Sequence, residues 1–285
     1  MSTRVTLANS PVVILAGGLG TRLRSIVSDR PKALAPIGEQ PFLEIQILLL
    51  RDQGARRFVL CVGHRAEQVQ NVLGDGTRLG VRIDYSVERE VLLGTGGALR
   101  LAAPLIESHA LVLNGDTYLA EDYGRILEHH FAERSVWNVV ATLTLARHEG
   151  ADRFGTVQLD STERFVSGFH EKVQSPTGSG FLNAGAYVVE RELIERIPPG
   201  RPCSLEREVF PNALASSARI ASFPTSQHFF DIGTPGDFQR FHGLYRAWSE
   251  ERLEPAVSGN AALVRELDPA QAAAGSRAPR RPRRC

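Results

Sequence analysis

A glycine-rich stretch near the start of the chain is the first feature whose residues could do chemistry. An apolar run at residues 12–15 leads into LAGGLGTRL, which has glycines at positions 17, 18 and 20. Glycine lets backbone N–H groups approach a phosphate chain closely, and the forked cation of Arg22 suits phosphate oxygens. Lys32, in RPKALAP, adds a second basic point. The stretch is typical of a phosphate-binding loop, although a plain strand-to-helix turn with a surface arginine would have the same pattern.

Two familiar nucleotide-binding motifs do not fit this stretch. A Rossmann fingerprint needs a third glycine where Arg22 stands, and a P-loop needs Gly-Lys-Ser/Thr. Because both are absent, the loop predicts a phosphate site of another kind.

Two aspartates that follow apolar or aromatic runs are candidate metal ligands. Asp116 comes just after the strand expected at residues 110–113, in VLNGDT, and Asp231 follows the aromatic residues of HFFDIGTPGDF. Mg²⁺ takes one or two carboxylates together with phosphate oxygens. With the phosphate loop, the pair predicts metal-assisted phosphate transfer. Single aspartates are more often helix caps or turn residues, and three others are interpreted so: Asp122, Asp160 and Asp237.

Polar residues of the second half are candidates for holding a sugar. Glu171 and Asn183 could hydrogen-bond sugar hydroxyls, and Lys172 could neutralise a sugar phosphate. The alternative for Glu171 and Lys172 is a solvated pair at a strand end, which is usual for adjacent opposite charges. A second glycine-rich turn, LLGTGGALR at residues 92–100, is expected to open a helix.

Short apolar runs alternate with amphipathic stretches in the first half, and these elements must position the residues above. Strands are expected at residues 12–15, 58–62, 81–87 and 110–113, separated by helices at 41–53, from about 65, and at 97–103. This alternation predicts an α/β fold with a doubly wound, mostly parallel sheet, whose ligands bind beyond the carboxyl ends of the strands. The second half is richer in strands, expected at residues 138–146, 156–159, 165–169 and 184–189, with helices near 204–215 and 235–251.

Composition limits the classes of partner and location. The net charge is +1, so no global attraction to nucleic acid or to an anionic membrane is expected. No apolar run approaches transmembrane length and the first ten residues lack a signal-peptide pattern, so the expected location is cytoplasmic. We expect an N-terminal extension over residues 1–10, a catalytic domain over 11–251, and a disordered basic tail over 252–285.

Together, the segments resemble the sugar-phosphate nucleotidyltransferase family. Seven of them stand in the family's order: LAGGLGTRL, RPKAL, LLGTGGA, LNGDT, FHEK, LNAGAYV and FDIGTP. The spelling of LLGTGGA, FHEK, SLEREVFP and FFDIGTPGDF is most similar to the D-glycero-α-D-manno-heptose 1-phosphate guanylyltransferases, with mannose-1-phosphate guanylyltransferases as near neighbours. The resemblance implies a Rossmann-like fold with a strand-rich sugar-binding part, Mg²⁺ dependence, and direct attack of a sugar 1-phosphate on the α-phosphorus of GTP.

The resemblance also implies roles for individual residues. The catalytic residues would be Arg22, Lys32 and Asp116. The nucleotide-binding residues would be Leu15, Gly17, Gly18, Gly20, Thr21, Glu88, Gly94 and Thr95. The residues that hold the sugar and its phosphate would be Gly115, Glu171, Lys172, Asn183 and Gly185. The metal ligands would be Asp116 and Asp231.

The chain departs from the family in one place, before the second glycine-rich turn. Family members often read Glu-Pro-Leu-Gly-Thr there, whereas this chain reads EREVLLGTGG, so Glu88 and Glu90 both remain candidates for facing the base. A thymidylyl- or uridylyltransferase is an alternative, as is a non-catalytic regulatory subunit that binds a nucleotide-sugar. Loss of Arg22, Lys32 or either metal aspartate would have favoured the regulatory subunit. GTP and a sugar 1-phosphate are the expected partners, and a homo-oligomer is left open.

Overall fold

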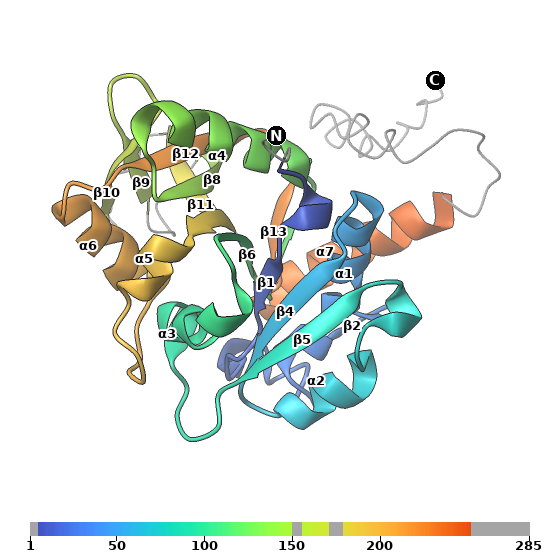
Figure 1. Ribbon diagram of the computed structural model, residues 1–285. Helices are drawn as coiled ribbons and strands as arrows, with labels where there is room; N and C mark the ends of the chain where they lie inside the picture. The colour runs from blue at the N-terminus through green and yellow to red at the C-terminus, as the bar shows by residue number, and fades with distance from the viewer. Residues whose placement is uncertain (1–4, 150–155, 171–178, 252–285) are drawn as a thin grey trace, which may run out of the picture.

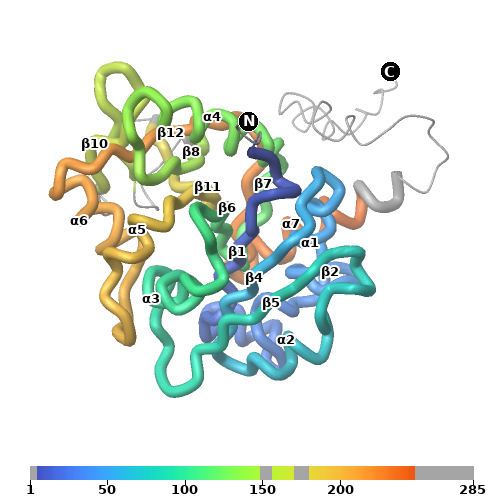
Figure 2. The backbone as a smooth tube through the Cα atoms, viewed as in Figure 1, coloured from blue at the N-terminus to red at the C-terminus, as the bar shows by residue number. Residues whose placement is uncertain are grey.

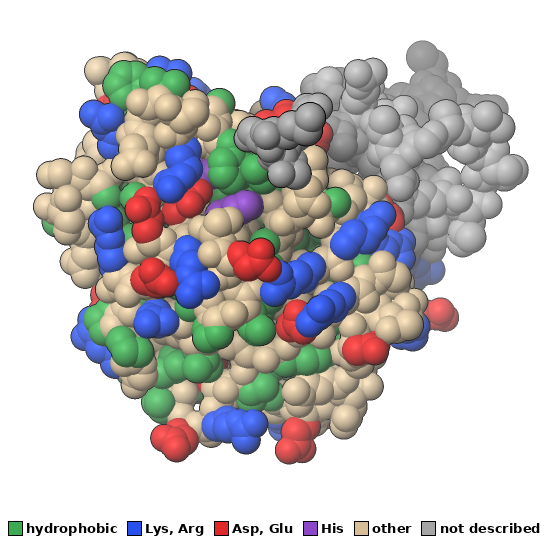
Figure 3. Space-filling view, in the orientation of Figure 1, with side chains coloured by type: hydrophobic (Ala, Val, Ile, Leu, Met, Phe, Trp, Pro, Cys, Tyr) green, Lys and Arg blue, Asp and Glu red, His purple; other side chains and the backbone are tan. Residues whose placement is uncertain are grey.

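The computed structural model describes residues 5–149, 156–170 and 179–251. The predictions for Glu171, Lys172 and the tail at 252–285 lie outside the described residues. Within them, no helix is both long and apolar enough to cross a membrane. On the face shown in Figure 3, Lys and Arg side chains are interspersed with Asp and Glu side chains.

A nine-stranded mixed sheet forms the centre of the described structure (Figure 1). Its first part is parallel, in the order β6-β1-β4-β5, and its second part begins where β11 pairs antiparallel with β6. Strand β9 pairs with β10 and β11, while β8 pairs with β11 and β12. The strands of this sheet are β1 (Val12–Leu15), β4 (Arg57–Val62), β5 (Arg82–Val87), β6 (His109–Asn114), β8 (Ala141–Glu149), β9 (Thr156–Leu159), β10 (Val166–His170), β11 (Ser179–Glu190) and β12 (Ile220–Thr225).

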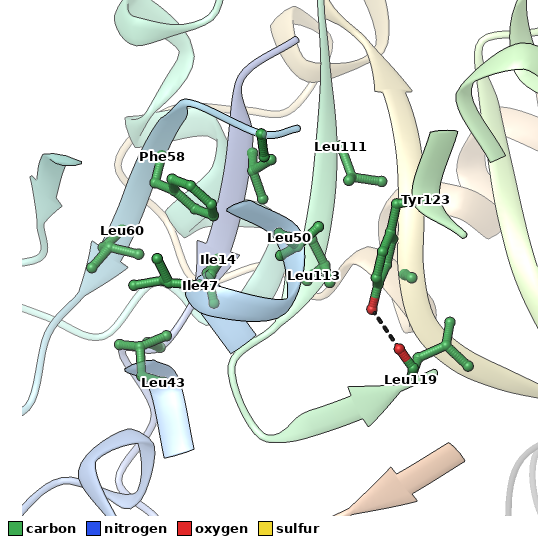
Figure 4. Packing of buried hydrophobic residues seen from close by; sticks show 14 of the residues in the cluster. Ile14, Leu43, Ile47, Leu50, Phe58, Leu60, Leu111, Leu113, Leu119 and Tyr123 are labelled. Atoms are coloured by element: carbon green, nitrogen blue, oxygen red, sulfur yellow. Dashed lines mark hydrogen bonds between the residues drawn. The ribbon is translucent and has the colours of Figure 1, made fainter. Parts of the chain in front are cut away.

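Helices cover both faces of the parallel part of the sheet. Successive side chains of a strand point to opposite faces, so a strand that is apolar throughout presents an apolar surface on each side. On β1, Ile14 packs in the same apolar cluster as Ile47 of α1, while Val13 belongs to the cluster that contains Leu99 of α3. Figure 4 shows the first cluster, in which Tyr123 of α4 also donates its hydroxyl to the carbonyl of Leu119 at 3.1 Å. The helices are α1 (Phe42–Asp52), α2 (Ala66–Leu73), α3 (Gly94–Leu101), α4 (Tyr123–Trp137), α5 (Arg191–Glu195), α6 (Phe210–Ala215) and α7 (Pro235–Glu251).

A small second sheet joins distant parts of the sequence. Strand β7 (Thr117–Leu119) pairs antiparallel with β13 (Phe229–Asp231), so that Asp231 lies opposite Thr117. An aromatic cluster supports this sheet from α7, which lies beside α1 in Figures 1 and 2. Within the cluster, Phe241 of α7 meets Phe42 of α1 edge-on, with ring centroids 5.5 Å apart. A third sheet consists of β2 (Pro36–Ile37) and β3 (Gln40–Pro41).

The expected fold class is confirmed, and the alternating elements of the first half lie close to their expected positions. Helix α3 begins at Gly94, three residues before its expected start at residue 97. The strand expected from residue 138 begins at Ala141, because Asn138 adopts a left-handed conformation and ends α4. Strand β11 begins five residues before its expected start at residue 184.

Two helical regions, at residues 123–137 and 205–215, differ in kind from expectation. Helix α4 has no counterpart among the expected elements, because its buried face includes His130 and Glu133 and therefore lacks a clean apolar period. The helix expected at 204–215 is divided into a π-helical turn, Leu205–Val209, followed by α6. Strand β12 and the pair β7–β13 were also not expected, since short strands carry little periodicity of their own.

Candidate active site

A cavity of about 460 Å³ lies at the carboxyl ends of the central parallel strands. The glycine loop after β1, the start of α3, and the segment after β6 form its walls. Twelve of the residues singled out from the sequence line it: Leu15, Gly17, Gly18, Gly20, Thr21, Arg22, Lys32, Glu88, Gly94, Thr95, Gly115 and Asp116. The structure thus brings together residues from four separate segments of the chain.

The glycine loop has the close packing that its composition suggested. A Cβ on Gly17 would collide with the Glu88 carboxylate, and a Cβ on Gly20 would lie 2.9 Å from the Cβ of Lys32. Gly20 also has a φ of +59°, in the left-handed region that glycine adopts at no steric cost. A short 3₁₀ turn, Thr21–Leu23, follows and carries Arg22 to the cavity wall. The loop is therefore closely packed against both Glu88 and Lys32.

An ammonium group lies between the two aspartates predicted as metal ligands. Lys32 Nζ donates to Asp116 Oδ2 at 2.7 Å and lies 3.8 Å from Asp231 Oδ1. Burial and repulsion from Asp116 raise the pKa of the Asp231 carboxyl, while Lys32, the Gly233 N–H and Arg22 oppose the rise. Arg22 forms no hydrogen bond or ion pair with any other residue that the structure describes, and its side chain is exposed. The two carboxylates and the two cations form one electrostatic group, which we call the cavity cluster (Arg22, Lys32, Asp116 and Asp231).

Backbone pairing, rather than local sequence, brings the two aspartates together. The N–H of Ile232 donates to the carbonyl of Asp116 at 2.9 Å, continuing the β7–β13 ladder. On the other side, the amide of Gln46 in α1 donates to the carbonyls of Asn114 and Thr117, at 3.0 and 2.5 Å. The segment that carries Asp116 is thus held from both sides.

The donor set of the cavity cluster fits a hard divalent cation that also binds substrate phosphates. Within the described part of the chain, no group of three or more His, Cys, Asp or Glu side chains is arranged to hold a metal ion by itself. Two carboxylates facing one cation are, however, what Mg²⁺ takes from a protein when phosphate oxygens and water complete its shell. Lys32 already occupies the position of such a cation. Asp116 and Asp231 are accordingly the two residues that could hold a metal here.

Of the two glutamates just past β5, Glu88 and not Glu90 faces the cavity. It is buried and lines the cavity, whereas Glu90 is exposed and does not. Glu88 Oε1 accepts a hydrogen bond from the N–H of Leu93 at 2.7 Å. Burial raises the pKa of Glu88, and the Leu93 hydrogen bond opposes the rise. The backbone N–H of Gly96 is taken by the carbonyl of Cys203 at 2.8 Å, so the start of α3 does not offer that donor to a ligand.

The residues predicted for the sugar side are placed only in part. Asn183 and Gly185 belong to β11 and do not line the cavity. Gly185 has a φ of +68°, and a Cβ there would lie 2.9 Å from Asn114 Nδ2, which places it directly behind a cavity residue. Asn183 accepts from the N–H of Gly185 at 2.9 Å and donates to the hydroxyl of Tyr187 at 2.8 Å.

Several residues of the site were not identified from the sequence. Asn114 ends β6 and lines the cavity, and its Oδ1 is buried without a hydrogen-bond partner. The pattern VLNGDT contained this signal, since a polar residue ends an otherwise apolar strand. Gln46 gave no such signal, because a glutamine inside an amphipathic helix is usually exposed. The remaining residues that line the cavity are Ala16, Leu19, Ala33, Leu92, Ala98 and Gly233.

Comparison with known proteins shows the same fold and a related sequence. The chain is 36% identical over 267 residues to the mannose-1-phosphate guanylyltransferase of Mycobacterium tuberculosis, which covers 93% of this chain and 67% of that protein. It is 35% identical to the D-glycero-alpha-D-manno-heptose 1-phosphate guanylyltransferase of Campylobacter jejuni, which covers 80% of this chain and 97% of that protein.

A solved structure with a similar fold is that of HddC from Yersinia pseudotuberculosis. It superimposes with a TM-score of 0.71 at 32% identity, covering 83% of this chain and 99% of HddC. HddC has also been crystallised in complex with GMP-PN. The sequence model of one protein family, described as nucleotidyl transferase, matches residues 11–247 of the chain. The chain belongs to the nucleotidyl transferase family.

Proposed function

We propose that the protein transfers a guanylyl group from GTP to a sugar 1-phosphate, giving a GDP-sugar and pyrophosphate. The observation that carries the proposal is the cavity cluster, where Lys32 lies between Asp116 and Asp231 beside the glycine loop. The two carboxylates suit a metal ion, while Arg22 and Lys32 are cations that can contact phosphate oxygens, and the cluster needs no protein nucleophile. The names of the relatives, two of them guanylyltransferases, support the choice of reaction.

In the proposed reaction, an oxygen of the sugar phosphate is the nucleophile. It forms a bond to the α-phosphorus of GTP as the bond from that phosphorus to the bridging oxygen breaks, and pyrophosphate leaves with the electron pair. The two reactants are both anions, so catalysis depends on aligning them and neutralising their charge. Arg22 and Lys32 line the cavity and would contact the phosphates in this scheme, and the glycine loop would let its backbone N–H groups approach them.

Asp116 and Asp231 are the residues that would hold Mg²⁺ in this scheme. When bound, such an ion supplies positive charge to the phosphate oxygens and helps to orient them. Lys32 shares the same carboxylates, so it has to release Asp116 in part when a second cation enters.

Glu88 is the residue proposed to select guanine. Guanine presents two adjacent donors, its ring N–H and its exocyclic amine, and one carboxylate can accept both. Thymine and uracil present a ring N–H between two carbonyls, which a carboxylate repels. A site built for specific hydrogen bonds can reject a mismatched partner by several orders of magnitude, about 10⁴ or more.

The sugar is proposed to be D-glycero-α-D-manno-heptose 1-phosphate, on the spelling of the segments around the site and the likeness to the Campylobacter jejuni protein. Mannose 1-phosphate is the second candidate, because the mannose-1-phosphate guanylyltransferase of Mycobacterium tuberculosis is equally similar to the chain.

A matrix of substrates tests the proposal directly. GTP, dTTP, UTP, ATP and CTP would each be combined with heptose, mannose and glucose 1-phosphates, and pyrophosphate release would be measured with Mg²⁺ and with a chelator. We expect release only with GTP, with the heptose or mannose phosphate, and with metal. Release from dTTP as fast as from GTP would refute the assignment of the base, and undiminished release in chelator would refute the assignment of the metal.

A further inference from the structure

A carboxylate behind the cavity has no role in the reaction described above. Glu206 belongs to the π-helical turn Leu205–Val209 and does not line the cavity. Its two oxygens instead accept hydrogen bonds from side chains at two different ends of the site. One end is that proposed for the nucleotide, and the other is that proposed for the sugar phosphate.

The nucleotide end is held through Thr95, a cavity residue in the first turn of α3. Its hydroxyl donates to Glu206 Oε2 at 2.9 Å and accepts from the N–H of Leu205 at 2.8 Å. Ser204 also donates its hydroxyl to Oε2 at 2.9 Å and accepts from the N–H of Arg207 at 3.2 Å. Because both hydroxyls already accept from a backbone N–H, their hydrogens point toward the carboxylate.

The sugar end is held through Tyr187, which is fully buried on β11. Its hydroxyl donates to Glu206 Oε1 at 3.1 Å and accepts from Asn183 Nδ2 at 2.8 Å. An ionised carboxylate can only accept, so the phenol must donate to it and must accept from the Asn183 amide.

This direction fixes the orientation of the Asn183 amide. Asn183 turns its Nδ2 toward Tyr187, which leaves its Oδ1 for the N–H of Gly185. Gly185 in turn packs against the side chain of Asn114, whose Oδ1 is buried without a partner at the cavity. A buried amide oxygen without a partner is costly, and a hydroxyl of the bound substrate would satisfy it. Burial and the charge of Glu206 raise the pKa of Tyr187 well above its ordinary value, so the phenol keeps its proton.

We propose that Glu206 is a positioning residue that sets the hydrogen-bond direction at both substrate ends together, through Thr95 at one end and through Tyr187 and the Asn183 amide at the other. The inference rests on the proposed function for the identity of the substrates. The directions of the hydrogen bonds follow from the side chains alone.

Glutamine is the informative substitution because it keeps the size of the side chain and removes its all-acceptor character. If the amide nitrogen of the new residue faces Tyr187, the phenol must donate to Asn183, and the orientation of that amide reverses. If it faces Thr95 and Ser204, their hydroxyl hydrogens lose their acceptor, because both oxygens already accept from backbone N–H groups. Glu206→Gln can satisfy one end of the site but not both.

The experiment compares five variants of the full chain: Glu206→Gln, Thr95→Val, Tyr187→Phe, the double variant Thr95→Val/Tyr187→Phe, and the triple variant that adds Glu206→Gln to it. Glu208→Gln is the matched control, because Glu208 lies in the same turn but accepts the N–H of Ser204 at 3.1 Å and pairs with Arg201 at 3.5 Å. For each variant, KM and kcat would be measured for GTP and for mannose 1-phosphate. Titration calorimetry with GTP and with mannose 1-phosphate would give Kd, and calorimetric melting would give Tm.

We expect Tyr187→Phe to raise KM for the sugar phosphate about tenfold with little change for GTP, and Thr95→Val to do the reverse. Glu206→Gln should raise KM for at least one substrate by a similar factor at nearly unchanged Tm, while Glu208→Gln stays at the wild-type values. Placed in the double variant, Glu206→Gln should add little, since the groups it orients are already gone.

Wild-type KM values in Glu206→Gln would overturn the inference. So would a full additional effect in the double variant, which would mean that Glu206 contacts substrate itself. A fall in Tm with equal loss for both substrates in every variant would show a purely structural role. If the wild-type protein works with a different nucleotide or sugar phosphate, the proposed function fails, and the positioning role of Glu206 is then tested with the substrates that it does use. If the wild-type protein binds neither a nucleotide nor a sugar phosphate, the proposed function and the role of Glu206 both fail.

Discussion

Two clusters of charged side chains in the described structure differ in exposure and in use. In the cavity cluster, Asp116 is 38% exposed and Arg22 has no ion-pair partner in the described part of the chain. Under α4, by contrast, His130 is wholly buried and its ring bonds Thr142 Oγ1 at 2.8 Å and Glu190 Oε1 at 2.9 Å. We call His130, Glu190 and Arg134 the α4 cluster, and Arg134 lies 3.4 Å from Glu190 and 3.1 Å from Glu192.

The difference shows what each cluster is arranged to do. The α4 cluster satisfies its charges within the fold, so it holds β8, β11 and the helix together. In the cavity cluster, Lys32 is paired with Asp116, but Arg22 and the partly exposed carboxylate of Asp116 also line an open cavity, where a ligand can contact them. Losing a charge should therefore affect turnover in one cluster and stability in the other.

The largest expected effect is from Asp116→Asn in the cavity cluster. Turnover should fall roughly a hundredfold or more, because the variant loses a proposed ligand of the metal ion that balances the charge of the reacting phosphates. Thermal unfolding should stay within a few degrees of wild type, since Asp116 is not part of the packed core. Pyrophosphate release and calorimetry measure the two effects, and Asp160→Asn, in an exposed turn, is the control. Full activity in Asp116→Asn would remove the distinction between the clusters.

The converse effect is expected from Glu190→Gln in the α4 cluster. Loss of the charge-assisted contacts to His130 and Arg134 should lower the free energy of unfolding by about 1.5–3 kcal/mol. Turnover below the melting temperature should not change. Urea unfolding measures the loss, and Glu192→Gln, whose side chain is 42% exposed, should lose less. A large loss of turnover in Glu190→Gln would mean that the two clusters communicate.

Glu88→Gln tests a buried acid that faces the cavity. Its kcat/KM for GTP should fall about tenfold or more, and the gap to dTTP should narrow. Burial raises the pKa of Glu88, so the carboxylate gains its proton at a higher pH than an ordinary carboxyl group does. The wild-type kcat/KM for GTP should therefore decline on the acid side at an unusually high pH, and that decline should be absent from the variant. If Glu90→Gln alone had this effect, the residue that contacts the base would be Glu90 and not Glu88.

The glycine loop gives a smaller and more local test of the same side of the cavity. Gly17→Ala should weaken GTP binding several-fold, because the added Cβ collides with the Glu88 carboxylate. A Cβ on Gly18 meets nothing within 4 Å, so Gly18→Ala should weaken binding less. Titration with GTP measures both, and equal losses would show that the collision is unimportant.

The smallest expected effect concerns a cap on the stability side. Asp122 accepts hydrogen bonds from the N–H groups of Gly124 and Arg125 and caps α4, at 2.9 and 3.4 Å. Asp122→Ala should cost about 1 kcal/mol of unfolding free energy and leave turnover unchanged. Unchanged stability in urea would show that water replaces the cap.

The sequence predicted the cavity side of the molecule better than the other side, for physical reasons. The glycine loop and Glu88 follow strands β1 and β5, so local pattern places them at the site, whereas Lys32 lies in a 3₁₀ turn and was singled out by its charge alone. Asp231 was predicted as a partner of Asp116, but the β7–β13 pairing that brings it there has no local signal. The register of β11 is likewise set by strands distant in sequence, with an irregularity between Asn183 and Tyr187.

Buried polar contacts were the least predictable part. Glu206 and Gln46 fall in stretches that the sequence predicted as ordinary helices, and His130 falls where no element was expected. A hydrogen-bond partner far away in the sequence leaves no periodic pattern. Asp122 was correctly interpreted as structural. The roles of Glu171 and Lys172, the cytoplasmic location and a homo-oligomer stay predictions.

The pairing of β7 with β13 also bears on when the protein becomes active during its synthesis. Asp231 leaves the ribosome only after α4 and β8 to β12, long after the glycine loop and Asp116. Contacts between such distant segments form late, because closing the long loop between them costs entropy. A nascent chain would carry the glycine loop and Asp116 while still lacking the second carboxylate. Asp231 can join Asp116 only once the strand-rich half has been synthesised and β13 has paired with β7.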